Sequence, residues 1–258
     1  FSVMSLDKFI KKLVDDSFYY SDYEFITNSQ LGLIKKDVRT YKMMRDNPEL
    51  NKETLPMIFG RAYHVAMLEP NEFNKKVLVF DSATRTTKGY KEFVSNNPNA
   101  STIILQREYD KIMYMQDVLF SHSEVKDLLQ SEGEREIANA WKDDDTNVFC
   151  KGKADYRNGK LLVDLKTTAD GSFYGFSNSC KKYGYDRQSA FYMDGFGCDE
   201  FVFITQEKER PYNVSIFYAG DEFVERGRQE YKYLLDVYRR FFIDNNEIVE
   251  QHLIMETL

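Results

Sequence analysis

The chain has 258 residues, of which 42% are hydrophobic and 30% charged, a balance typical of a soluble globular protein with a sizeable core. The aromatic content of 15% argues against disorder, and the net charge of −7 argues against nucleic-acid binding unless basic groups gather on one surface. No segment approaches the about 20 apolar residues of a membrane span, and no signal peptide is visible. Three scattered cysteines without CxxC spacing are expected to be free thiols in a reducing cytoplasm.

The N-terminal part is predicted to be helical. Apolar residues recur at helical spacing from Ser5 to Asp16, and Thr27-Asn28-Ser29 can cap a second helix from about Gln30 to Arg45. A third helix is predicted between Pro56 and Pro70 and carries His64. A lone helical histidine is more often structural than a metal ligand. His64 becomes a candidate ligand only if acidic residues elsewhere bind a metal that needs a further ligand.

The middle of the chain gives weaker signals. Phe80–Ala100 is polar and is predicted to be a long loop or an interrupted helix, whereas Arg107–Gln130 has a helical pattern. Basic residues in the polar stretch are expected to face solvent, with a DNA-facing surface as the alternative; they are Arg85, Lys88 and Lys91.

The C-terminal half is predicted to alternate between strands and helices. Strands are expected at Glu134–Trp141, Val148–Tyr156, Lys160–Thr167, Glu200–Gln206 and Pro211–Ala219. A loop is expected at Asp170–Tyr185, and helices at Asp186–Gly195 and from Asp221 to about Asn245. The fold class is therefore α/β (α+β), with a mixed central sheet flanked by helices. We expect one domain over 1–258, with an N-terminal helical elaboration (1–55) and a core (56–245).

One hairpin carries the most informative pattern. Asn158-Gly159 is a strong signal for a two-residue type I′ turn, because both central residues of that turn need positive φ. Such a turn pairs Arg157 with Lys160 and places Asp155 opposite Leu162.

The hairpin register predicts which side chains share a face of the sheet. Strand residues two apart lie on the same face, so Asp155, Asp164 and Lys166 are expected together. The opposite face is expected to pack under a helix through Gly152, Ala154, Leu161, Val163 and Leu165. Two acids and a lysine on a half-buried sheet are costly unless something uses them, and a divalent metal would. The alternative is a surface cluster of salt bridges.

Four short motifs together resemble the PD-(D/E)xK nuclease superfamily, in its RecB-like branch. In chain order they are Gly60-x-x-x-His64, Gly152-Lys153-Ala154-Asp155, Asp164-Leu165-Lys166 and Gln188-x-x-x-Tyr192. Stretches such as FGRAYHVAMLEP and CKGKADYRNGKLLVDLKTT narrow the resemblance to the RecE-type exonucleases (exodeoxyribonuclease VIII) of phages and prophages. The resemblance runs from about Asn28 to Arg228. Ala154 departs from it, since the superfamily has proline there.

The resemblance implies a metal site. Asp155 would bridge two Mg²⁺ ions, for which Mn²⁺ could substitute. Asp164 and the backbone carbonyl of Leu165 would complete the coordination of the first ion. His64 would be an additional ligand. Glu134 or Glu136, on the preceding strand, would be an outer or additional metal residue.

The remaining motif residues receive catalytic roles from the same resemblance. Lys166 would orient the attacking water or lower its pKa. Gln188 and Tyr192 would hold the substrate phosphate and brace Lys166.

The activity that the resemblance implies is a Mg²⁺-dependent exonuclease acting on linear double-stranded DNA. It would digest 5′ to 3′ and leave 3′ tails for a single-strand-annealing recombinase, as a ring-shaped homo-oligomer around DNA in the cytoplasm of a bacterium or phage-infected host, without a membrane. One alternative is a structure-specific or restriction-type endonuclease of the same superfamily. The other is a non-catalytic DNA-binding or assembly module.

Overall fold

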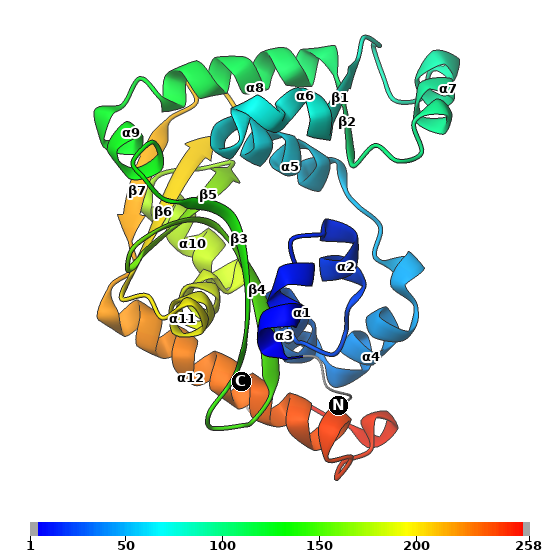
Figure 1. Cartoon of the computed structure of the whole chain (residues 1–258), viewed down its shortest axis with the longest axis vertical. Coiled ribbons are helices and arrows are strands. Elements are labelled where there is room, and N and C mark those ends of the chain that lie inside the picture. Colours follow the sequence, from blue (N-terminus) through cyan, green and yellow to red (C-terminus); the bar gives the residue numbers. More distant parts are fainter. Residues whose placement is uncertain (1–4, 255–258) are drawn as a thin grey trace.

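The computed structural model describes residues 5–254 and builds them around a five-stranded mixed sheet (Figure 1). Its strands are β3 (Glu134–Lys142), β4 (Phe149–Asn158), β5 (Leu161–Thr168), β6 (Glu200–Glu207) and β7 (Val214–Tyr218), paired in that order. Only β5 and β6 run parallel, and the other neighbours are antiparallel. The predicted fold class, a mixed central sheet flanked by helices, is confirmed.

Helices cover both faces of this sheet (Figure 1). One face carries α10 (Phe173–Tyr183), α11 (Tyr185–Phe196) and α12 (Asp221–Tyr238), and the other carries α5 (Leu55–Leu68), α8 (Gln106–Leu119) and α9 (Ser123–Leu129). Leu162 and Phe203 pack toward the first layer, whereas Val163 and Ile204 pack toward the second. This alternation is expected of central strands buried on both faces. Within residues 5–254, no helix combines the length and apolar character needed to cross a membrane.

The N-terminal helices are shorter than predicted. They are α1 (Leu6–Lys12), α2 (Asp16–Ser21), α3 (Asn28–Lys36) and α4 (Val38–Asp46). Thr27 caps α3 as expected, with its hydroxyl accepting a hydrogen bond from Gln30 N–H. The predicted single helix over 30–45 is wrong, because Asp37 is extended and its carboxylate accepts from Arg39 N–H at 2.7 Å. Aspartate is a strong helix-capping residue, so Asp37 ends α3 and starts α4.

A small outlying unit was not predicted. The strands β1 (Val77–Phe80) and β2 (Thr102–Leu105) form a two-stranded parallel sheet, and α7 (Lys88–Asn96) lies between them in sequence and extends away from the main sheet (Figure 1). The stretch Phe80–Ala100, predicted to be a loop or an interrupted helix, contains α7, and the two strands lie at its ends. Strands of four residues are too short to show a period, which explains why neither strand was predicted.

Two further expectations are corrected. The stretch expected as a loop forms α10, whose start is capped by the Ser172 hydroxyl accepting from Gly175 N–H and whose end is Gly184 in the left-handed region. The predicted helix over 107–130 is interrupted at 120–122, between α8 and α9. The remaining short elements are α6 (Phe73–Lys76), η1 (Pro48–Leu50), η2 (Pro70–Glu72), η3 (Arg239–Ile243) and η4 (Val249–Gln251).

The hairpin turn lies one residue further along than predicted. Asn158 pairs with Leu161, so Gly159 and Lys160 are the two turn residues. The predicted type I′ turn on Asn158-Gly159 is wrong, since φ is positive at Gly159 (57°) but not at Asn158. Glycine at the first central position is the preference of a type II′ turn.

The shift of the turn does not by itself exchange the two faces of the hairpin. Moving the turn by one residue changes the cross-strand pairing by two, so Leu162 pairs with Arg157 instead of Asp155. A change of two keeps each side chain on its side of the sheet, whereas a change of one would reverse it. If continued, the observed register would bring Asp155 opposite Asp164.

The strand β4 changes its orientation at Asp155. Ala154 packs into the α11 layer, but Tyr156, two residues on, packs into the α5 layer. On the partner strand, Glu136 has a positive φ of 49° while the residue pairs on either side keep their register. The expectation that Ala154 shares a face with Val163 is therefore wrong, because a local twist at Asp155 and Glu136 reverses the alternation.

A buried lysine connects the N-terminal helices to the sheet. Lys151 of β4 is only 1% exposed, and its Nζ donates to the Tyr19 carbonyl (2.6 Å), the Asp22 carbonyl (2.8 Å) and the Asp22 carboxylate (2.9 Å). Three oxygen acceptors complete the hydrogen bonding of the ammonium and offset the cost of burying it.

Replacing Lys151 by methionine keeps the apolar stem but leaves the Asp22 carboxylate buried without its cation. We expect Lys151→Met to lower the free energy of unfolding by about 3–5 kcal/mol, the usual effect of breaking a buried pair. Urea denaturation followed by circular dichroism measures it. As the matched control, Lys88→Met removes a 91% exposed side chain and should change stability by less than about 0.5 kcal/mol. Equal effects of the two variants would contradict this role for Lys151.

Candidate active site

The candidate site lies where β4 and β5 separate. The two strands pair at only three positions next to the turn. Beyond them, Asp155 Oδ2 accepts a hydrogen bond from Leu165 N–H at 2.8 Å. A side-chain carboxylate thus replaces the backbone carbonyl that would normally continue the ladder. The separation makes room for side chains between the strands.

Three potential metal ligands meet at this point. The imidazole of His64 on α5, the carboxylate of Glu136 on β3 and that of Asp155 on β4 each offer an atom within 4.8 Å of the others. His64 Nδ1 lies 3.4 Å from Asp155 Oδ1. Between the two glutamates left open by the sequence, the structure selects Glu136. Glu134 is exposed and lies 4.0 Å from Arg157.

The backbone at Glu136 is held in an unusual conformation. A φ of 49° is uncommon for a non-glycine residue inside a strand. Such conformations cost about 1–3 kcal/mol and gather at functional sites, where the surrounding structure maintains them. At Glu136 the result is a carboxylate directed toward His64 and Asp155.

The three groups influence one another's pKa strongly. Burial, together with the nearby Asp155, raises the pKa of Glu136 to about 7. Burial lowers the pKa of His64, but Asp155 outweighs this effect and brings it to about 9. Burial opposes ionisation of Asp155, yet His64 and Lys166 hold its pKa below the ordinary value. His64, Glu136 and Asp155 are suitable ligands for a divalent cation. A bound cation would replace the positive charge that the proton on His64 now provides beside the two carboxylates.

A second set of contacts fixes Asp164. Gln188 Nε2 on α11 donates to Asp164 Oδ1 at 2.7 Å, and Lys166 Nζ lies 2.7 Å from Asp164 Oδ2. Burial raises the pKa of Asp164, and Lys166 counteracts it. Burial also lowers the pKa of Lys166, but Asp164 outweighs this effect and the pKa rises. Lys166 therefore remains an ammonium group at neutral pH.

Within residues 5–254, neither residue of the Gln-Tyr motif has a hydrogen bond to Lys166, and bracing of Lys166 by the two residues stays a prediction. Gln188 donates to Asp164 instead, and the Tyr192 ring packs beside Gly152, where an added Cβ would lie 3.0 Å from it. Lys166 is contacted by Tyr185, with Nζ 4.8 Å from the ring centroid. The phosphate-holding roles of Gln188 and Tyr192 stay predictions.

The predicted residues thus form two adjacent groups. His64 and Asp155 join Glu136, while Asp164 and Lys166 lie beside them. Metal ligation by Asp164 and by the Leu165 carbonyl stays a prediction.

Sequence reasoning missed Tyr185 because it lay in a stretch expected to be a loop. Its spacing holds the signal that could have found it, since it precedes Gln188 by three residues. Residues at i and i+3 share a helix face.

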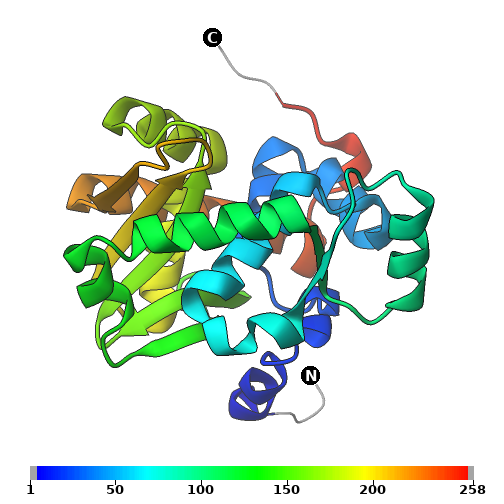
Figure 2. The same cartoon turned by 90° about the horizontal axis from the view of Figure 1, so that it is seen from above.

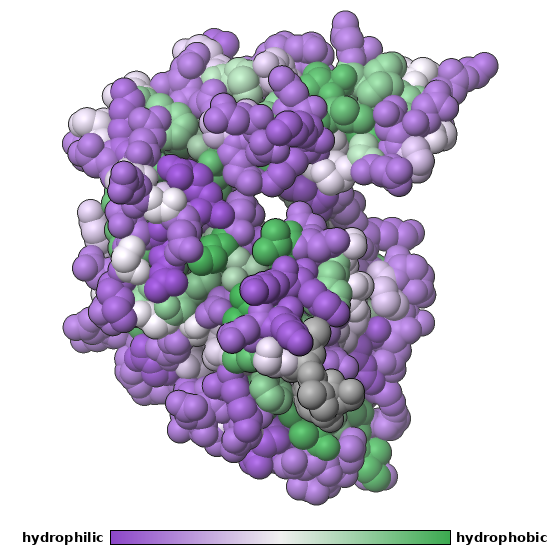
Figure 3. All heavy atoms as spheres, in the orientation of Figure 1, coloured by the Kyte–Doolittle hydropathy of each residue, from purple (hydrophilic) through white to green (hydrophobic). Residues whose placement is uncertain are grey.

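The surface is hollowed between the α5–α7 segment and the α1–α2 segment, with mostly hydrophilic side chains along the rim (Figure 3). Tyr20 of α2 lies within electrostatic reach of both Arg61 on α5 and Glu136. The metal-ligand group is therefore close to this hollow.

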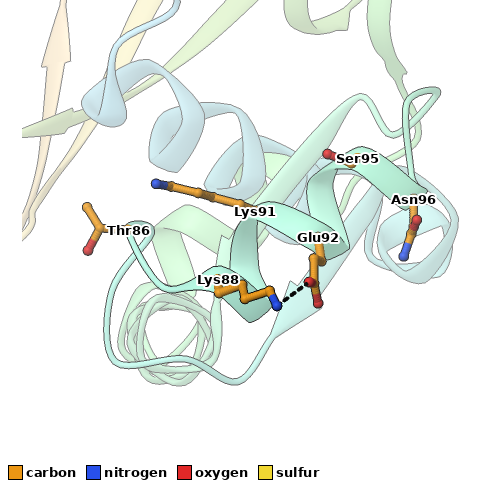
Figure 4. Close-up of a pocket in the computed structure, with 6 residues that line it drawn as sticks. All are labelled: Thr86, Lys88, Lys91, Glu92, Ser95 and Asn96. Carbon is orange, nitrogen blue, oxygen red and sulfur yellow. Dashed lines mark ion pairs between the residues drawn. The ribbon is translucent and has the colours of Figure 1, made fainter.

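A separate open pocket of about 690 Å³ lies on α7 (Figure 4). Two of the basic residues named for DNA contact have acidic partners: Arg85 pairs with Glu108 at 2.6 Å, and Lys88 lies 3.6 Å from Glu92. Lys91 has no ion-pair partner among residues 5–254 and extends away from that pair (Figure 4). Contact of this segment with DNA stays a prediction.

Residues 33–247 match a family described as a PDDEXK-like domain of unknown function (DUF3799). The chain belongs to this family. Membership confirms the predicted relationship to the PD-(D/E)xK superfamily. No curated protein matches the sequence.

Among solved structures, a protein of Eubacterium rectale described as a candidate exonuclease is similar over 100% of this chain and 96% of its own, with 12% identity and a TM-score of 0.62. A phage-related exonuclease of Haemophilus somnus 129PT has 13% identity over 65% of this chain and 92% of its own, with a TM-score of 0.35. The first similarity supports the same overall fold for this member of the PDDEXK-like family.

The two glutamates of β3 form a matched pair for testing the metal site. Glu136→Gln removes one charged donor of the group, so we expect Mn²⁺ or Mg²⁺ affinity to fall about 10- to 100-fold. Isothermal titration calorimetry measures the change. Glu134→Gln alters an exposed side chain on the same strand and should leave the affinity unchanged. Equal affinities for both variants would exclude Glu136 as a ligand.

Proposed function

We propose that this protein is a divalent-metal-dependent exodeoxyribonuclease that degrades linear double-stranded DNA. The observation that carries the proposal is the pairing of two groups at one break in the sheet: the donors His64, Glu136 and Asp155, and beside them the ammonium of Lys166 held by Asp164. Carboxylate ligands can hold a cation that activates water, and a positive side chain can stabilise the charge that develops on the phosphate during phosphodiester hydrolysis.

The chain's own residues divide the work of the reaction. A bound divalent cation would supply Lewis-acid stabilisation of the phosphoryl oxygens and a water of lowered pKa. Lys166, being protonated, acts as a hydrogen-bond donor that orients the attacking water and offsets negative charge developing on the phosphate. Asp164 fixes that ammonium, and Gln188 fixes Asp164 from the neighbouring helix.

The finer assignments follow the resemblance to RecE-type exonucleases. Carboxylate ligands with a single imidazole suit Mg²⁺, with Mn²⁺ as a substitute and two ions in the site. The polarity would be 5′ to 3′, leaving 3′ tails for a single-strand-annealing recombinase in the cytoplasm. The Eubacterium rectale protein of similar fold is described as a candidate exonuclease, which supports the exonuclease activity alone.

Cleavage assays distinguish the exonuclease from its alternatives. Linear, nicked and closed circular duplexes, labelled at 5′ or 3′ ends, are incubated with the protein and either Mg²⁺ or EDTA. We expect metal-dependent loss of the linear DNA alone, with the 5′ label released first. Cleavage of closed circles would favour an endonuclease, and no cleavage of any duplex would favour a non-catalytic module.

Variants in the same assay test the role of the lysine. Lys166→Met should lower the cleavage rate by at least about 100-fold, as expected for loss of a group that stabilises developing charge. Lys160→Met, in the hairpin turn, serves as the control and should cleave normally. A fully active Lys166→Met protein would contradict the mechanism.

We expect the protein to form a ring-shaped homo-oligomer. A net charge of −7 opposes DNA binding by an isolated chain, whereas a ring can line its channel with basic groups and keep acidic groups outside. Sedimentation velocity at working concentrations measures the assembly. A monomer would argue against the ring.

A further inference from the structure

A row of aromatic rings leads outward from Lys166 at the junction of α10 and α11. The Tyr185 ring lies 4.8 Å from Lys166 Nζ and stacks on Tyr183 with centroids 5.7 Å apart. The Tyr183 ring is therefore at most about 10.5 Å from Nζ. Gly184, with φ of 67°, provides the bend that brings the two tyrosines side by side.

The inner and outer rings of this row differ in their surroundings. Tyr185 also stacks on Phe203 at 5.7 Å and contacts Phe176 at 5.8 Å, so the protein core holds it in place. Tyr183 is 53% exposed. An exposed ring backed by a rigid stack is the arrangement that nucleic-acid-binding proteins use to stack a base.

Positive charge accompanies the exposed ring. Lys182 Nζ lies 5.1 Å from the Tyr183 ring, and neither Lys181 nor Lys182 has an ion-pair partner among residues 5–254. The neighbouring acid, Asp186, is paired with Arg226 at 2.8 Å. Positively charged side chains in the last turn of a helix interact favourably with the helix dipole, which explains the two lysines at the end of α10. It does not explain the exposed ring beside them.

The outer face of α10 continues the same chemistry. Tyr174, Asn178 and Lys182 are four residues apart and therefore lie on one face, spaced by about 6 Å along the helix axis. All three are exposed, and Tyr174 is 77% exposed. The yellow-green α10 lies at the periphery of the molecule, on the opposite side from α7 (Figure 2).

We propose that Tyr183, Lys182, Asn178 and Tyr174 form a track that binds a single strand of DNA adjoining the scissile phosphate. This inference rests on the proposed nuclease function. Tyr183 stacks on a base, Lys182 contacts a backbone phosphate, and the other two residues continue the contact along α10. Flat π-faces, unpaired cations and a short path to Lys166 match a nucleotide strand, which carries both aromatic bases and negative phosphates.

Strand binding is measured by fluorescence anisotropy with a short fluorescein-labelled oligothymidylate. The full chain carries Asp164→Asn as the parent, so that the probe is not degraded. We expect Tyr183→Leu to weaken binding at least about fivefold, while Tyr183→Phe, which keeps the ring, binds nearly as the parent does. Lys182→Ala should weaken binding and reduce the slope of log affinity against log salt by about 0.7.

Matched exposed residues elsewhere provide the controls. Tyr233→Leu on α12 removes a ring that is 64% exposed, and Lys126→Ala removes an exposed lysine on α9. Both should bind as the parent does. The proposal is overturned if the parent does not bind the oligonucleotide, if Tyr183→Leu and Lys182→Ala bind normally, or if the controls weaken binding equally.

Cleavage by the unmodified chain separates this proposal from the nuclease function. If linear DNA is cleaved and the Tyr183 and Lys182 variants bind normally, the proposed track is contradicted while the proposed nuclease function stands. If binding depends on Tyr183 but no duplex is cleaved, the proposed nuclease function is contradicted, while α10 still binds a DNA strand.

Discussion

The hydrogen bond from Leu165 N–H to the Asp155 carboxylate is the contact on which the candidate site depends. It satisfies a backbone donor that would otherwise be left unpaired where β4 and β5 separate. Because the bond comes from a side chain, the strands can diverge without leaving this donor unpaired. The opening admits His64 from α5 on one side, while Gln188 on α11 reaches Asp164 on the other.

Charge compensation explains why these groups form one unit. Asp155 and Glu136 lie against His64, and Asp164 lies against Lys166, so each buried carboxylate has a cation nearby. Removing one member would leave a partner charged and poorly solvated, which is more costly than the pair itself. The protein thus accommodates a cluster of acids that is expensive without a bound cation, and the raised pKa of Glu136 reflects that expense.

Prediction from the sequence succeeded where the signal was local and strong. The strand β3, the hairpin strands and helix α5 lie near their expected positions. It failed where one residue altered the geometry. Asp37 capped a new helix inside an apparently continuous pattern, and Ser172 started a helix in a stretch rich in glycine and serine. At the turn, glycine alone took the positive φ, and the pairing is moved by two residues, a shift that by itself reverses no face.

The sequence by itself determined which chemical groups are available, their order along the chain and, through the period of two, that Asp164 and Lys166 share a face. The family match over residues 33–247 also depends on the sequence alone. Tertiary structure alone decided that Glu136 rather than Glu134 joins the ligand group and that Tyr185 contacts Lys166. The physical reason is that periodicity specifies directions within one element, whereas distances between elements depend on packing and local backbone twists that no short pattern encodes.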